Sequence, residues 1–322
     1  MKKKERVMAA IAGKKFDYTP SGFWLHFPLE QQRWENALEA HLEFMKDTDT
    51  DICKVMNEAL LRGEKRIEKP SDYRDLKITE ATKENLKKQV ELVRQIVKRA
   101  GDEMAVLITV HGALVSAHHA SLRPGFYVDN IDFFRRCFHE DREALLAALE
   151  QVTTVLCDFV KQCKKAGADG IYYALLGAEK DLFTAEEYHK YIEPFDRRIL
   201  EAANDGQGFH VLHLCKKNLD ITRFADYPAE VINWGVYEDN PSLEEGFRIF
   251  PNKVILGGMD NSKGVLVDGT EEEIEAEVKG LLASVDRKRF ILGADCTLPT
   301  DISRERIRAV VNASRNFGGM EE

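Results

Sequence analysis

The segment KVILGGMDNSKGVLVDGTEEEIEAEVKGLLASVDRKRFILGADC, residues 253–296, contains the pattern that decides the fold. Its two ends, 253–258 and 289–294, are nearly continuous apolar runs, as expected for strands that are buried on both faces. Between them, Thr270 and Glu273 have the spacing of a capping box, in which side chains satisfy the free N–H groups at the start of a helix. Strand, helix and strand in this order predict a parallel β-α-β unit.

The same alternation extends over the whole chain. Helical spacing of apolar residues connects Trp34 to Met45, Leu86 to Val97 and Leu145 to Phe159, and a second capping box begins at Thr184. A last helix around 307–311 should end at Gly318-Gly319, where a left-handed residue is easy to form. The expected strands are 21–27, 51–56, 105–111, 170–176, 210–215, 231–236, 253–258 and 289–294. Eight such units predict a single-domain (β/α)8 TIM barrel over residues 1–322, with an open doubly wound sheet as the alternative.

Composition narrows the classes of function. The chain has 322 residues, of which 44% are hydrophobic and 31% charged, and its net charge is −9. These values are typical of a globular protein and argue against a nucleic-acid partner, which favours a basic surface. The start lacks a secretory pattern, and no apolar stretch is long enough for a membrane span, so we expect a cytoplasmic protein with its six cysteines reduced. The oligomeric state stays open.

The most informative polar residues follow two of the expected strands. His213 and Cys215 are two positions apart at the end of the fifth run, so they point to the same side. Cys296 follows the eighth run, and the carboxyl ends of all barrel strands meet at one rim, where active sites lie. One imidazole and two thiolates are a typical zinc set, and three ligands leave a position open for catalysis. On this spacing alone, inert buried cysteines are the competing interpretation.

The chain also resembles the uroporphyrinogen decarboxylase superfamily over nearly its whole length, and within it the cobalamin-dependent methyltransferases. The similar segments, in order, are RVMAAIAG (6–13), DYTP (17–20), GADGI (167–171), the run 184–194, GGMD (257–260) and GADC (293–296). The resemblance implies a (β/α)8 barrel, in agreement with the pattern.

Two features favour the methyltransferase branch over the decarboxylases. The decarboxylases carry an Arg-Gln-Ala-Gly-Arg segment that grips substrate carboxylates, whereas residues 23–28 here read FWLHFP and the first following arginine is Arg33. The His-x-Cys…Cys set of His213, Cys215 and Cys296 is the mark of methyltransferases. The resemblance therefore implies a zinc ion, a methylcobalamin-type corrinoid donor carried on a partner corrinoid protein, and a small thiol or a pterin as acceptor.

Further candidates for the site follow the other strands. Glu179 is a possible fourth zinc ligand or a solvated loop charge. His111 and His118, with the adjacent His119, are candidates for contact with corrinoid or substrate, or are hydrogen-bonded loop histidines. Asp260 could orient substrate or a ligand histidine, as second-shell carboxylates do, or cap a helix.

Near the first two runs, His26, Asp51 and Lys54 are predicted to line the pocket and contribute to cofactor binding.

Two other functions remain as hypotheses. One is decarboxylation of an acidic tetrapyrrole, for which Arg33, Arg62 and Arg123 are the available cations. The other is a non-catalytic barrel that binds a corrinoid or zinc, which would require a closed site with four protein ligands.

Overall fold

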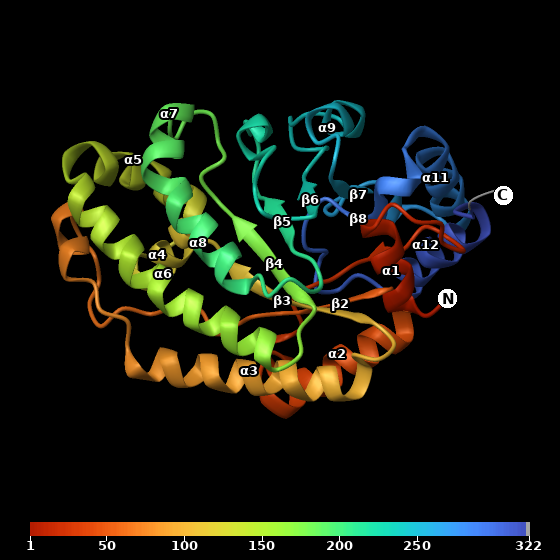
Figure 1. Cartoon of the computed structure of the whole chain (residues 1–322), viewed down its shortest axis with the longest axis horizontal. Helices are drawn as coiled ribbons and strands as arrows, with labels where there is room; N and C mark the ends of the chain where they lie inside the picture. Colours follow the sequence, from red (N-terminus) through yellow and green to blue (C-terminus); the bar gives the residue numbers. More distant parts are fainter. Residues whose placement is uncertain (320–322) are drawn as a thin grey trace.

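The computed structural model describes residues 1–319 and contains a ring of eight parallel strands surrounded by helices (Figure 1). The strands follow one another around the ring in sequence order, with β8 beside β1. The backbone N–H of Asp51 donates to the carbonyl of Ser21 at 2.9 Å, which joins β2 to β1. The predicted barrel is therefore confirmed. The strands are β1 Ser21–Gly22, β2 Ile52–Val55, β3 Ala105–His111, β4 Gly170–Leu175, β5 Val211–Leu214, β6 Val231–Trp234, β7 Val254–Met259 and β8 Phe290–Ala294.

The outer layer of the barrel is formed by helices that pack against the strands and against each other, as α3, α6 and α8 do around β3 and β4 (Figure 1). Both predicted capping boxes are present, at Thr184 and Thr270, and a third occurs at Ser242. The helices are α1 Lys3–Ile11, α2 Trp34–Thr48, α3 Glu80–Ala100, α4 Ala113–Ala120, α5 Ile131–Glu140, α6 Arg142–Lys165, α7 Ala185–Glu187, α8 Glu193–Ala203, α9 Leu243–Ile249, α10 Val265–Asp268, α11 Glu271–Ser284 and α12 Arg304–Phe317.

Two local predictions are corrected. The first strand ends at Gly22 instead of residue 27, because the chain leaves the ring there and returns only for a single bridge between Leu25 and Leu298. The last helix ends at Phe317 with Gly318 as its cap, but Gly318 has φ −88°, so no left-handed residue forms the cap there.

The amino-terminal end of the barrel is closed by α1 and a buried ion pair. Arg6 Nη1 lies 2.6 Å from Asp51 Oδ1, and Asp51 Oδ2 accepts hydrogen bonds from Ser21 N at 2.8 Å and Ser21 Oγ at 3.1 Å. The prediction that Asp51 lines the pocket is therefore wrong. Asp51 precedes the first residue of β2 and so lies at the end of the barrel opposite the carboxyl-terminal rim. Among residues 1–319, no helix has the length and apolarity required to cross a membrane.

Candidate metal centre

The structure brings His213, Cys215 and Cys296 together at the carboxyl-terminal rim. His213 lies in β5, Cys215 follows that strand directly, and Cys296 follows β8. One donor atom from each residue lies within 4.8 Å of the others, and Cys296 Sγ is 3.4 Å from His213 Nε2. Tetrahedral zinc with ordinary bond lengths would place a nitrogen and a sulfur ligand roughly 3.6 Å apart. The donor set and its spacing therefore fit a zinc ion with one open position.

The orientation of His213 is fixed by Asn233, a fully buried residue of β6. Asn233 Nδ2 donates to the carbonyls of Leu256 at 2.8 Å and Ala294 at 3.2 Å, so its Oδ1 faces the histidine. His213 Nδ1 lies 2.6 Å from this oxygen. Because an amide oxygen only accepts, Nδ1 carries the proton and the lone pair of Nε2 faces the cysteines. This arrangement, in which a second residue sets the tautomer of a ligand histidine, is typical of metal sites.

Sequence reasoning did not identify Asn233. The available signal was an amide in the middle of the otherwise apolar run VINW, residues 231–234. A buried amide inside a strand needs partners for its donors and its acceptor, so such a residue indicates a polar network. Tyr172 belongs to the same network. Its hydroxyl donates to Asn233 Oδ1 at 2.9 Å, and its ring stacks on His213 with centroids 5.4 Å apart.

The two cysteines of the centre differ in acidity. The adjacent Cys215 thiol, followed by His213, lowers the pKa of Cys296 well below its usual value, against the opposing effect of burial. The neighbouring Cys296 sulfur and burial raise the pKa of Cys215. A thiolate at Cys296 is thus favoured, and thiolates are the form in which cysteines bind metals. The chemistry of the donor set agrees with its geometry.

Lys54 lies in the barrel interior beside this centre. Its Nζ is 3.1 Å from Met56 Sδ and 4.5 Å from the centre of the Tyr172 ring. The Trp24 ring lies on another side, 5.2 Å from Nζ. Burial lowers the pKa of Lys54 to about 7, although the negative charges of Cys296 and Glu58 oppose this shift. The structure therefore places Lys54 inside the barrel, and its role in lining the pocket or binding a cofactor stays a prediction.

Glu179 and Asp260 are both buried carboxylates at the rim. Glu179 Oε2 accepts from Gly177 N at 2.8 Å, and burial raises its pKa. The interpretation of Glu179 as a solvated loop charge is therefore wrong, while its role as a fourth zinc ligand stays a prediction. Asp260 Oδ1 accepts from Ser262 N at 2.8 Å, Ser262 Oγ at 3.0 Å and Lys263 N at 3.2 Å. Asp260 thus closes a turn after β7, and it is neither a cap of α10 nor the residue that orients His213.

The histidines after β3 form a cluster of His111, His118 and His119. The rings of His111 and His119 meet edge to face with centroids 5.2 Å apart, and those of His118 and His119 are 5.8 Å apart. Burial lowers the pKa of His111 to about 4, so its ring is neutral at pH 7. Within the described part of the chain, the buried Nδ1 atoms of His118 and His119 have no hydrogen-bond partner. Contact of this cluster with substrate or corrinoid stays a prediction.

His26 follows β1 and lies at the rim of the barrel. Its side chain is 48% exposed, and Nδ1 is 2.6 Å from Glu58 Oε1. Because half of the ring faces solvent, His26 could meet a ligand only at the outer mouth of the barrel. Its predicted cofactor contact stays a prediction.

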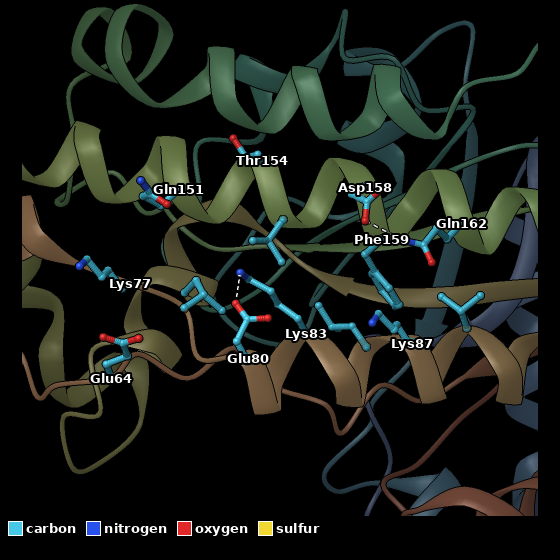
Figure 2. Close-up of a pocket in the computed structure, with 14 residues that line it drawn as sticks. Glu64, Lys77, Glu80, Lys83, Lys87, Gln151, Thr154, Asp158, Phe159 and Gln162 are labelled. Carbon is cyan, nitrogen blue, oxygen red and sulfur yellow. Dashed lines mark hydrogen bonds and ion pairs between the residues drawn. The ribbon is translucent and has the colours of Figure 1, made fainter.

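A large groove lies elsewhere, on the outside of the helical layer between α3 and α6 (Figure 2). It has a volume of about 550 Å³, and Figure 2 shows Lys83 paired with Glu80 on one wall and Asp158 with Gln162 on the other. Not one of the residues predicted for the site lines this groove. The groove and the metal centre are therefore separate features.

Fold and site together define a (β/α)8 barrel with a candidate metal centre at its carboxyl-terminal rim. The chain belongs to the uroporphyrinogen decarboxylase (URO-D) family, whose model matches residues 62–317. The cysteines and the histidine of the centre lie within this matched range. The family assignment agrees with the resemblance drawn from the sequence.

Two curated relatives share one description, methylcobamide:CoM methyltransferase MtbA. The protein from Methanosarcina mazei is 22% identical over 225 residues, which are 70% of this chain and 62% of the relative. The protein from Methanosarcina acetivorans is 21% identical over 229 residues, which are 71% and 63% of the two chains. The matches thus span about three fifths of the length of these relatives. A solved structure described as a methyltransferase from Methanosarcina mazei has the same fold, with a TM-score of 0.77, 18% identity and coverage of 98% of this chain and 99% of that chain.

Proposed function

We propose that this protein is a zinc-dependent methyltransferase that moves a methyl group from a methylated corrinoid protein to a small thiol or a pterin. The observation that carries the proposal is the convergence of His213 Nε2, Cys215 Sγ and Cys296 Sγ within 4.8 Å at the catalytic rim of a TIM barrel. The name of the two relatives supports the choice of methyl transfer and of a corrinoid donor.

The three side chains would hold zinc, which lowers the pKa of a bound thiol and keeps its sulfur as a thiolate nucleophile. The side chains around the centre would set its protonation and its charge. Asn233 keeps the Nε2 atom of His213 free of a proton through its contact with Nδ1. Cys215 and Cys296 contribute two negative charges, and sulfur ligands leave the metal electron-rich. An electron-rich zinc would bind the sulfur of the acceptor thiol less tightly, so that this sulfur stays nucleophilic.

The decarboxylase hypothesis is weaker because the available arginines have structural tasks. Arg123 donates to Asn130 Oδ1 at 2.9 Å and to the Ile67 carbonyl at 3.1 Å. Arg62 Nη1 donates to the His119 carbonyl at 3.3 Å. A substrate with many carboxylates needs free guanidinium groups for bidentate binding. Arg33 alone would not supply them.

Metal analysis and a methyl-transfer assay test the proposal together. The wild-type protein should contain one zinc per chain and convert methylcobalamin and a thiol to cob(I)alamin and the thioether, which can be followed by absorbance. Cys296→Ser should lose both zinc and turnover. Cys157→Ser is the matched control, since Cys157 is a half-buried cysteine of α6 outside the centre. Metal-free wild-type protein with full turnover, or unchanged zinc and turnover in Cys296→Ser, would refute the proposal.

A further inference from the structure

We propose that Lys54 supplies the positive charge that balances a thiolate bound at the metal centre. The site would then take an acceptor that binds as an anionic sulfur in preference to a neutral pterin nitrogen. This inference rests on the proposed function and chooses between the two acceptor classes that it leaves open.

The first observation is that the ammonium group of Lys54 lacks an adequate partner. An ammonium has three N–H donors, and within the described residues only the weak acceptor Met56 Sδ lies within hydrogen-bond distance. Within residues 1–319, no ion pair joins Nζ to a carboxylate, and Glu58, whose charge also acts on Lys54, is bonded to His26 instead. Lys54 is only 5% exposed, and a buried unpaired charge is costly. An anion bound beside Lys54 would remove this cost.

A second donor nearby is also without a partner. The ring of Trp24 lies 5.2 Å from Lys54 Nζ and 4.8 Å from the Tyr172 ring. In the described part of the chain, the buried Trp24 Nε1 has no hydrogen-bond acceptor. An indole N–H donates only, so both unsatisfied groups in this part of the barrel call for an acceptor. The aromatic faces of Trp24 and Tyr172 meanwhile stabilise the cation, as such faces do.

Charge counting identifies the kind of acceptor. A zinc ion with two cysteine thiolates and a neutral histidine has no net charge. A bound thiolate, whose proton goes to the buffer, makes the centre negative by one unit, and Lys54 restores neutrality. A neutral nitrogen brings no negative charge for Lys54 to balance. The attraction between unit charges about 6–12 Å apart at an effective dielectric of about 20 corresponds to about tenfold to hundredfold tighter binding.

The experiment measures ligand binding to the cobalt(II)-substituted protein by visible absorption, from the sulfur-to-cobalt charge-transfer band for a thiolate and from the ligand-field bands for a nitrogen ligand. The probes are 2-mercaptoethanol, which binds as an anion, and imidazole, a neutral nitrogen ligand for the same open position. The variant is Lys54→Met, which keeps the volume and removes the charge. Lys88→Met is the matched control, because Lys88 also lies over an aromatic ring, that of Trp34, but on the outer helices.

We expect Lys54→Met to retain its metal and thermal stability and to bind 2-mercaptoethanol at least tenfold more weakly, with imidazole affinity unchanged. Lys88→Met should match the wild type for both probes. Thiol affinity within twofold of the wild type in Lys54→Met, or an equal loss for both probes, would overturn the role of Lys54 while leaving the proposed function intact. A wild-type protein that binds neither zinc nor cobalt would instead overturn the proposed function.

Discussion

Replacement of Asn233 by alanine should lower both the free energy of unfolding and the affinity of the candidate centre for zinc, and the two effects can be measured separately. The side chain of Asn233 makes four buried hydrogen bonds, two as acceptor, from His213 and Tyr172, and two as donor, to the carbonyls of Leu256 and Ala294. Asn233→Ala leaves all four partners buried without it.

The magnitude follows from the number of orphaned groups. Each buried group left without a partner costs about 1–3 kcal/mol, and small shifts or a trapped water recover part of this. We therefore expect a loss of about 3–5 kcal/mol in the free energy of unfolding. Freed from Asn233, the imidazole of His213 can rotate or change tautomer, and loss of such a partner typically weakens metal binding about 10–100-fold.

The assay pairs denaturant unfolding of the metal-free protein with competition for zinc against a chelator. Asn130→Ala is the control, because Asn130 is also a buried asparagine that bonds to carbonyls, of Pro124 and Phe126, but far from the centre in the chain. It should destabilise the fold and leave zinc affinity unchanged. If Asn233→Ala bound zinc as tightly as the wild type, Asn233 would be a purely structural residue and the argument on the tautomer of His213 would fail.

Two further predictions concern stability. Arg6→Met leaves the fully buried carboxylate of Asp51 without its cation, so chemical denaturation should show a loss of about 3–5 kcal/mol; a loss below about 1 kcal/mol would contradict the ion-pair argument. Burial raises the pKa of Asp196 to about 6, against hydrogen bonds from Tyr173 and Tyr188, whereas an unfolded aspartate titrates near 3.9. The stability gained from the protonated Asp196 is complete below about pH 4 and is lost as the pH rises through 6. In Asp196→Asn, the free energy of unfolding should therefore depend less on pH between 4 and 7. An unchanged slope would rule out Asp196 as the source of that dependence.

The strands and their order could be predicted from the sequence because a parallel strand buried on both faces leaves a local signal. The run 105–111 coincides with β3, and the runs at the fifth, seventh and eighth strands differ from the structure by a residue or so at their ends. Strand direction also placed Cys215 and Cys296 at one rim. The predicted strand 21–27 was too long, because the chain leaves the ring after Gly22. An apolar sequence indicates that residues are buried, but it does not show where their backbone stops pairing with a neighbouring strand.

The sequence by itself determined the barrel, the family and the three candidate donor residues, because apolar periodicity and residue type are properties of short segments. Only the tertiary structure decided which polar residues serve the centre. Asp51 pairs with Arg6 at the closed end, Asn233 orients His213, and Lys54 lies beside Met56 Sδ inside the barrel. Those roles depend on distances between side chains from different strands, and such distances exist only once the ring has closed.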